Sequence, residues 1–230
     1  MKLSRRRTLE RIGWTGDFNK FREIYHELTL EDLKLLYRIW LVKYPEQSYF
    51  DSIFFLSCIE KVKHELGRNP KIVELGGYDG KLAYEILKKH SGINWLNIEI
   101  IRHDVNVVPE LKNYDYTEHV LFHAKQVYDE KLDLSGFDVF ISSDTIEHLS
   151  NNELIKLYNY LVETNIKYLM LKINVYQNGQ SWEGYGGTHL LTFGVNQLKK
   201  IFKEHYEMAE EKDSEPHFGW DSFWIKDEGK

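Results

Sequence analysis

A short apolar run that ends in closely spaced glycines and leads into an amphipathic segment constrains the fold of this chain most. The run Lys71–Leu75 reads Lys-Ile-Val-Glu-Leu, and Gly76 and Gly80 follow it. Residues 81–89 then have the apolar spacing of a helix. The sequence therefore predicts a buried strand, a tight turn and a helix, an arrangement in which backbone can pass close to a ligand. The apolar residues of the helical segment are Leu82, Ala83, Ile86 and Leu87.

The chemistry of this turn indicates the kind of ligand that it binds. Glu74, at the end of the strand, places a negative charge where a cationic ligand group can sit. S-adenosylmethionine (SAM) carries a sulfonium and an ammonium group on a nucleoside, so it is such a ligand. The dinucleotide pattern G-x-G-x-x-G is not met, because Gly76 and Gly80 are four residues apart and Tyr78 stands where a middle glycine belongs. Two spaced glycines can also simply close a tight turn.

A second motif further along the chain supports a cofactor site. Residues 137–149 read Phe-Asp-Val-Phe-Ile-Ser-Ser-Asp-Thr-Ile-Glu-His-Leu, which predicts a buried strand and a polar loop. Together with Glu74–Gly80, this segment resembles the class I (Rossmann-like) SAM-dependent methyltransferases in the content and order of its motifs, from about Asp51 to the end of the chain. The Glu-His-Leu ending is frequent in the small-molecule branch of that family. Tyr78 is the departure from the family's first motif.

Composition excludes several classes of protein. A chain of 230 residues with 42% hydrophobic residues suits one domain with an appendage. The formal net charge of -6 argues against a general nucleic-acid binder. Cys58 is the only cysteine, which excludes disulfides and cysteine zinc sites. No apolar run follows Arg5–Arg7, and no stretch reaches the roughly 20 apolar residues of a membrane span, so we expect a cytoplasmic soluble protein without a signal peptide.

Helical patterns before the glycine turn divide the chain into two parts. Thr29 is a candidate N-cap for a helix that Pro45 ends. Asp51 can begin a second helix, which Gly67 and Pro70 end. We therefore expect an N-terminal helical cap or lid over residues 1–50 and a SAM-binding methyltransferase domain over residues 51–230.

From the glycine turn onward, strands and helices alternate, which predicts a parallel sheet. The last two strands follow each other without a helix, so they are expected to form an antiparallel hairpin at the sheet edge. The predicted fold is α/β: a Rossmann-like, seven-stranded, mostly parallel sheet with an antiparallel last strand and an N-terminal helical cap. The expected strands are Ile72–Leu75, Trp95–Ile100, His119–His123, Asp138–Ser142, Tyr168–Ile173, Tyr206–Glu210 and Ser222–Ile225.

Ligands of open parallel sheets bind beyond the carboxyl ends of the strands, which selects the loops there as the cofactor site. Glu99, near the end of the second strand, can accept hydrogen bonds from two ribose hydroxyls, and the resemblance implies the same role. Asp104 competes with it if that strand runs on. Lys125 and Gln126 follow the third strand and can reach the adenine edge, although the family's Asp or Asn is missing. The predicted cofactor-binding residues are Glu74, Gly76, Gly77, Tyr78, Gly80, Glu99, Lys125, Gln126, Ser143 and Asp144.

The loop after the fourth strand carries the candidate catalytic residues, His148 and Asp144. An imidazole there can act as a general base on a hydroxyl or an amine. Asp144, Glu147 and His148 also repeat the acid-x-x-Glu-His spacing with which ubiquinone-type O-methyltransferases hold a divalent metal. Glu147 and His148 can instead brace the loop by hydrogen bonds. We predict no metal site, and methyl transfer from a sulfonium needs none, because it mainly requires alignment and the exclusion of water.

The substrate side is expected in two segments outside the sheet pattern. Residues 182–189 follow the fifth strand, and their glycines let a loop fold over a ligand. Trp182, Tyr185 and His189 are the candidate substrate residues, with an ordinary surface loop as the alternative. The aromatic N-terminal segment, which includes Trp14, is the other candidate wall of the substrate site.

These observations predict SAM-dependent methyl transfer to oxygen or nitrogen of a small molecule, with no membrane partner. Three alternatives remain open. The first is a methyltransferase for RNA or protein that uses the N-terminal helices, although the acidic charge disfavours it. The second is a non-catalytic SAM-binding or scaffold protein, and the third is a nicotinamide dehydrogenase, against which Tyr78 counts. The sequence names neither the acceptor nor the oligomeric state.

Overall fold

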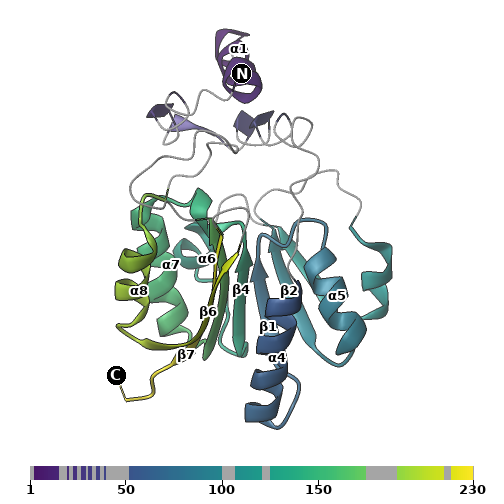
Figure 1. Ribbon diagram of the computed structural model, residues 1–230. Coiled ribbons are helices and arrows are strands. Elements are labelled where there is room, and N and C mark those ends of the chain that lie inside the picture. The colour runs from purple at the N-terminus through teal and green to yellow at the C-terminus, as the bar shows by residue number, and fades with distance from the viewer. Residues whose placement is uncertain are drawn as a thin grey trace.

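The structure is a computed structural model that describes residues 3–15, 52–99, 107–120, 125–174, 191–214 and 219–229, together with short stretches between residues 20 and 39 (Figure 1). Its strands are β1 (Lys71–Leu75), β2 (Asn94–Glu99), β3 (Tyr116–Val120), β4 (Val139–Ser143), β5 (Tyr168–Asn174), β6 (Tyr206–Ser214) and β7 (Gly219–Lys226). Its α-helices are α1 (Leu3–Thr15), α4 (Ser52–Leu66), α5 (Lys81–Lys89), α6 (Lys125–Asp129), α7 (Asn151–Glu163) and α8 (Val195–Phe202). Its 3-10 helices are η2 (Pro109–Asn113) and η3 (Ile146–His148).

All seven strands form one sheet in the order β3-β2-β1-β4-β5-β7-β6. The strands β1 to β5 pair in parallel, and β7 runs antiparallel to both β5 and β6. The predicted Rossmann-like sheet with a reversed last strand is therefore confirmed. The β6–β7 hairpin forms one edge of the sheet, with β6 outermost, and β3 forms the other edge.

The predicted boundaries differ from the structure most at three strands: β6 and β7 are longer than predicted, and β3 begins earlier. The pattern predicted a start at His119, whereas β3 begins three residues earlier, at Tyr116, which pairs with Trp95 of β2. Tyr116 packs on the core, while Thr117 and His119 are exposed. One face of an edge strand is exposed to solvent, so about half of its residues are polar and the sequence pattern did not reveal where the strand begins. Its pairing with β2 sets this start.

The core lies in two layers, one on each face of the sheet. Consecutive strand residues point to opposite faces, so Ile72 packs in one layer and Val73 in the other. The helices α4 and α5 cover the Ile72 face, and α6, α7 and α8 cover the Val73 face (Figure 1). Because both faces are covered, β1 and β4 are mostly apolar, which made these central strands visible in the sequence.

Local signals fixed the ends of several helices. The side chain of Ser150 accepts from the backbone N–H of Glu153, whose carboxylate accepts from the Ser150 N–H, so a capping box begins α7. Gly67 follows α4 with a φ of 65° and donates its N–H to Lys63 O, as expected of a glycine stop. The helix α8 ends at Phe202. None of the described helices is long and apolar enough to cross a membrane.

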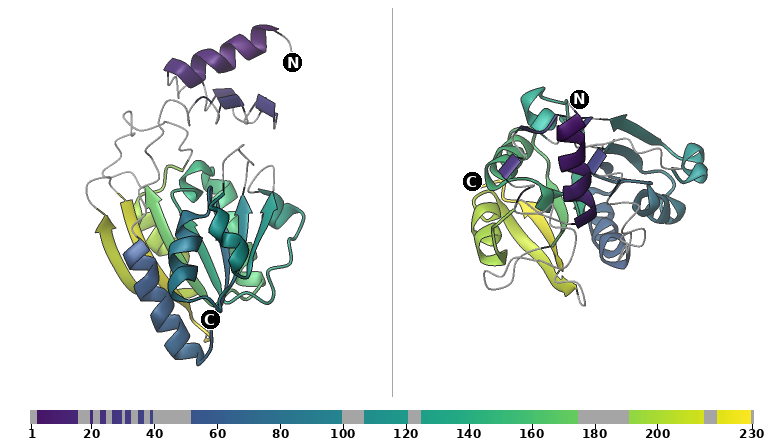
Figure 2. Two further views of the ribbon diagram at one scale, coloured as in Figure 1. Left: turned by 90° about the vertical axis from the view of Figure 1, so that its right-hand side faces the viewer. Right: turned by 90° about the horizontal axis from the view of Figure 1, so that it is seen from above.

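The described part of the N-terminal segment has buried side chains of its own. Leu9 and Ile12 of α1 are buried, as are Leu36 and Ile39, and these four residues belong to neither layer of the sheet core. Thr29 makes the contacts predicted for an N-cap, since its Oγ1 accepts from the Asp32 N–H. Figure 2 shows α1 beyond the end of the sheet toward which the arrowheads of the parallel strands point.

Candidate functional site

The turn between β1 and α5, residues 76–80, lies at the middle of the sheet. β1 is flanked there by β2 on one side and β4 on the other, so the strand order reverses at this point. Open α/β sheets bind ligands beyond the strand ends at such a reversal. Gly76 donates its N–H to Ile98 O of β2 at 2.8 Å, and Thr145, beyond β4, donates its hydroxyl to Gly76 O at 3.4 Å. The turn is thus attached to both neighbouring strands.

Two of the four described residues other than glycine with positive φ lie in the loops beyond β1 and β4. Tyr78 has a φ of 50° and Asp144 a φ of 51°, while Lys131 and Asn165 lie elsewhere. Left-handed backbone costs a residue other than glycine about 1–2 kcal/mol. Such residues persist where the surroundings hold them, and they cluster at functional sites. The two strained positions belong to the two segments that the sequence selected for the cofactor.

The glycines of the turn are required by contacts within the protein. A Cβ on Gly76, whose φ is 80°, would lie 2.1 Å from Thr145 Oγ1. A Cβ on Gly77 would lie 2.4 Å from Glu74 Oε2, and one on Gly80 would lie 2.4 Å from Leu111 Cδ1. The sequence reasoning assigned these glycines to space for a ligand. In the structure, the space around each missing Cβ is filled by protein atoms, so the glycines first of all allow the turn to pack on its neighbours.

Glu74 is a buried acid beneath the turn. It is 1% exposed, and its Oε2 accepts the indole N–H of Trp95 at 3.1 Å. Burial raises the pKa of Glu74 to about 8, and the charges of Glu99 and Asp79 also raise it. The hydrogen bond from Trp95 lowers this pKa. Three carboxyl groups therefore lie close enough to influence one another around residues 76–80. A cationic ligand group would relieve their repulsion.

Asn97 is a site residue that the sequence reasoning missed. It is fully buried in β2, and its Oδ1 accepts the N–H of Gly77 at 3.0 Å. Its Nδ2 donates to the hydroxyl of Tyr116 on β3 at 3.1 Å. An amide in the middle of an otherwise apolar strand was the available signal, because a buried amide needs partners.

Glu99 lies at the end of β2, as predicted. Its Oε2 accepts the N–H of Tyr78 at 2.8 Å, which helps to hold the strained Tyr78 in place. The carboxyl of Glu99 is therefore next to the turn and half exposed. Its rival, Asp104, lies outside the described residues.

The structure says less about the residues predicted to contact the adenine, Lys125 and Gln126, and about the predicted substrate residues. Lys125 is the first residue of α6, and nothing is described of its side chain. Gln126 donates its amide to Glu130 Oε1 at 2.5 Å, which is a bond within the α6 region. The predicted substrate residues Trp182, Tyr185 and His189 lie outside the described residues.

The loop after β4, residues 144–150, holds a network of polar side chains. Asp144 Oδ2 lies 3.3 Å from Lys172 Nζ and accepts from Ser143 Oγ at 3.2 Å. Asn174 donates to Asp144 Oδ1 and to Glu147 Oε1, both at 2.9 Å. The expected bracing by Glu147 is therefore present, and it runs through an asparagine that the sequence reasoning did not select.

His148 ends η3 and is half exposed, and its backbone N–H donates to Thr145 O at 3.0 Å. Within the described ranges there is no group of three His, Cys, Asp or Glu side chains placed to hold a metal ion. The side chain of Glu147, which the metal-binding spacing would use, is instead bonded to Asn174.

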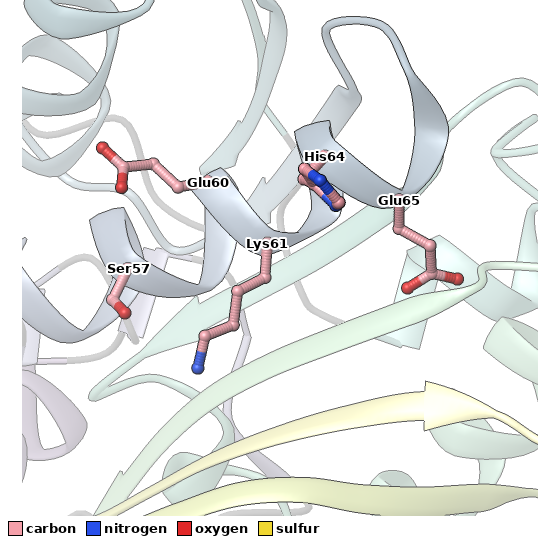
Figure 3. Close-up of a pocket in the computed structure, with 5 residues that line it drawn as sticks. All are labelled: Ser57, Glu60, Lys61, His64 and Glu65. Atoms are coloured by element: carbon pink, nitrogen blue, oxygen red, sulfur yellow. The ribbon is translucent and has the colours of Figure 1, made fainter.

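A surface hollow lies elsewhere, on α4. Figure 3 shows its five lining side chains, which all come from this one helix: Ser57, Glu60, Lys61, His64 and Glu65. Lys61 is paired with Glu210 of β6, and Glu65 lies 3.0 Å from Lys167, just before β5. Lys167 marks the amino end of that strand, opposite the β1–α5 turn. The hollow is therefore crossed by ion pairs that join α4 to the sheet, and it is separate from the candidate site.

Comparisons with known proteins were made by sequence and by structure. No family model matches the sequence, and no curated protein matches it. The bifunctional kinase-methyltransferase WbdD has a similar structure, with a TM-score of 0.59 and 15% identity over 80% of this chain and 42% of WbdD. This chain thus spans about two fifths of the length of WbdD.

Two further similar structures match over most of their own length. The 1,6-didemethyltoxoflavin-N1-methyltransferase of Burkholderia thailandensis, solved with S-adenosylhomocysteine, has a TM-score of 0.63 and 10% identity over 86% of this chain and 91% of that one. The methyltransferase domain of bacterial CtHen1 has a TM-score of 0.53 and 16% identity over 75% of this chain and 97% of that one. With the sheet order described above, these similarities show that the chain has the fold of the class I SAM-dependent methyltransferases.

Proposed function

We propose that this protein is a SAM-dependent methyltransferase. The observation that carries the proposal is the acid-lined β1–α5 turn at the centre of a methyltransferase sheet. Glu74, Asp79 and Glu99 surround it, and Glu74 is buried. SAM has a sulfonium and an ammonium group, so its positive charge complements the carboxylates of Asp79 and Glu99 and would favour ionisation of the buried Glu74. Its lack of phosphates fits a turn that does not carry the dinucleotide glycine pattern.

The roles of the side chains follow from their places. Glu99, at the end of β2, would accept the ribose hydroxyls, and Asn97 would hold the turn beneath the cofactor. When bound, SAM supplies a methyl group on a sulfonium, and its transfer leaves a neutral thioether. Asp144 and His148, beyond β4, would face the acceptor and take the proton that it loses.

The acceptor in this proposal is oxygen or nitrogen of a small molecule. The similar toxoflavin enzyme is named for methylation of a small heterocycle, which supports this class. The formal net charge of -6 makes RNA a less fitting acceptor. A larger partner bound by the N-terminal segment is the second candidate.

The cofactor is tested by thermal unfolding of the whole chain with SAM, S-adenosylhomocysteine and NAD. A ligand at a hundred times its dissociation constant stabilises by about 2.7 kcal/mol. For a chain of this length that is a rise of about 5–10 °C in the unfolding midpoint. We expect this rise with SAM and with S-adenosylhomocysteine and none with NAD. A rise with NAD alone would reject the proposal in favour of a dehydrogenase.

The acceptor side is proposed to lie between residues 1–50 and the loop 144–150. The position of α1 beyond the carboxyl ends of the strands supports this. So do the buried residues Leu9 and Ile12 of α1, which are not part of the sheet core. We expect the same result for two separate variants, a shortened chain that starts at Ser52 and the full chain with His148→Ala. Both should keep the SAM-dependent rise in the unfolding midpoint and lose methyl transfer in a screen of hydroxyl and amine acceptors. A chelator is expected to leave transfer unchanged. Full transfer by the shortened chain would assign residues 1–50 to stability instead.

A further inference from the structure

Glu147 combines burial with incomplete hydrogen bonding. The residue is fully buried in η3, and its Oε1 accepts from Asn174 Nδ2. Its Oε2 is buried and has no hydrogen-bond partner among the described residues. Burial raises the pKa of Glu147 to about 8, and the negative charge of Asp144 adds to this rise. Burial and the charge of Asp144 thus both favour the neutral form of the Glu147 carboxyl group.

Asn174 joins this acid to Asp144. A side-chain amide nitrogen has two hydrogens, and Asn174 donates one to Glu147 Oε1 and one to Asp144 Oδ1. Its donor capacity is thus fully used. The negative charge of Asp144 disfavours ionisation of Glu147, while the hydrogen bond from Asn174 favours it, and the effect of Asp144 is the larger of the two.

Asp144 needs this support because its backbone is strained. With a φ of 51° it stays in place only if its surroundings hold it. Lys172 and Asn174, two residues apart on the same face of β5, contact its two carboxylate oxygens from one side. Glu147 holds Asn174 from the other side. The carboxylate of Asp144 is therefore fixed in direction as well as in position.

The backbone of Glu147 makes a second connection. Its carbonyl oxygen accepts the N–H of Leu191 at 3.1 Å. Asn174 is the last residue of β5, and Leu191 begins the chain that leads into α8. One residue of η3 thus binds the end of β5 through its side chain and the start of the next described segment through its backbone.

We propose that Glu147 is a positioning residue, which through the side-chain amide of Asn174 fixes the carboxylate of Asp144 in the loop after β4. The inference rests on the proposed function only in that Asp144 contacts the cofactor or the acceptor. The alternative is that Glu147 merely fills and stabilises the core under the loop 144–150.

The test compares Glu147→Gln, Glu147→Ala, Asp144→Asn and the double variant Asp144→Asn/Glu147→Ala. The exposed Glu85→Ala on α5 is the control for the loss of one carboxylate. Affinity for S-adenosylhomocysteine is measured calorimetrically well below every unfolding midpoint. We expect Glu147→Ala to weaken binding at least tenfold and Glu147→Gln to recover most of it, because a glutamine carbonyl accepts the same bond from Asn174. The double variant is expected to bind no more weakly than Asp144→Asn alone.

A core-filling role makes a different set of results. Glu147→Ala would then be less stable but bind S-adenosylhomocysteine as the native chain does. Alternatively, its loss of binding affinity would add fully to the loss caused by Asp144→Asn. Either result overturns the inference. If the native chain binds neither SAM nor its product, the proposed function fails. The same four variants in a denaturant series then still decide whether Glu147 and Asp144 are coupled, since additive losses of stability would reject the coupling.

The pH dependence of stability is an independent readout. An acid whose pKa is raised by folding stabilises the native state below its unfolded pKa, and that stability is lost as the pH rises toward the folded pKa. The titratable and charged groups near Glu147 are Asp144, Lys172, which contacts Asp144, and the adjacent His148. Stability of the native chain is expected to fall between about pH 4.5 and 8. In Glu147→Gln, stability should fall less steeply with pH, and the remaining dependence should come from Glu74. A pH dependence equal to that of the native chain would contradict a neutral Glu147.

Discussion

Replacing Gly76 with valine is expected to abolish cofactor binding. A residue with a Cβ at a φ of 80° costs about 1–2 kcal/mol in backbone strain alone. The new Cβ would also lie 2.1 Å from Oγ1 and 2.5 Å from Cγ2 of Thr145, so the β1–α5 turn or the segment beyond β4 has to move. Both segments belong to the proposed cofactor site. Calorimetry should detect no binding of SAM, with the folded state checked by circular dichroism.

Gly67 provides a matched control for this prediction. Its φ is 65°, close to that of Gly76, but a Cβ there meets nothing within 4 Å. Gly67→Val thus has similar backbone strain without the collision, and it should lower stability while SAM binding persists. Gly76→Ala is the milder variant if Gly76→Val fails to fold. A folded Gly76→Val that binds SAM with native affinity would show that the turn is not part of the site.

Replacing Glu99 with alanine is expected to weaken SAM binding by about 1.5–3 kcal/mol, the range for hydrogen bonds to a charged group. This is a loss of roughly 10- to 150-fold in affinity, since 1.4 kcal/mol corresponds to a factor of ten. Two contributions add up here. Alanine removes the proposed acceptor of the ribose hydroxyls, and it also removes the acceptor of the Tyr78 N–H, which holds a residue with positive φ. The measurement is the dissociation constant of SAM.

Glu99→Gln separates the two contributions. Glutamine keeps a carbonyl oxygen for the Tyr78 N–H but loses the charge, so affinity restored to the native value would assign Glu99 to the turn and not to the ribose. Glu110→Ala, an exposed acid on η2, controls for the change in net charge and should bind SAM normally. If Glu99→Ala binds SAM normally and Asp104→Ala does not, the ribose contact belongs to Asp104.

The elements that follow local rules could be predicted from the sequence. The run Lys71–Leu75 is apolar because helices cover both of its faces, and the capping box at Ser150 satisfies the first N–H groups of α7 within a few residues. Gly67 ended α4 for a similarly local reason, because it adopts a positive φ without strain. Such signals depend on neighbours in the chain, so the alternation of strands and helices, and with it the fold class, was predicted correctly.

The candidate site was predictable only in part. Glu74, Glu99 and the glycines were found because ligands of such sheets bind beyond the strand ends, and the structure brings these residues together around one turn. Asn97 was not found, although it holds Gly77 from the neighbouring strand. The packing role of Gly76 was not predictable either, since the atoms that a Cβ would meet there belong to Thr145, beyond β4.

The sequence by itself determined which segments become strands and helices, which faces are apolar and which loop carries the acids. Only the tertiary structure decided how these groups act on one another. Thr145 reaches Gly76 across 69 residues of chain, and Asn174 reaches Asp144 across 30. Such contacts depend on the register of paired strands, and a pKa near 8 for Glu147 depends on its burial beside another acid. Register and burial arise from packing between distant segments, which no local pattern encodes.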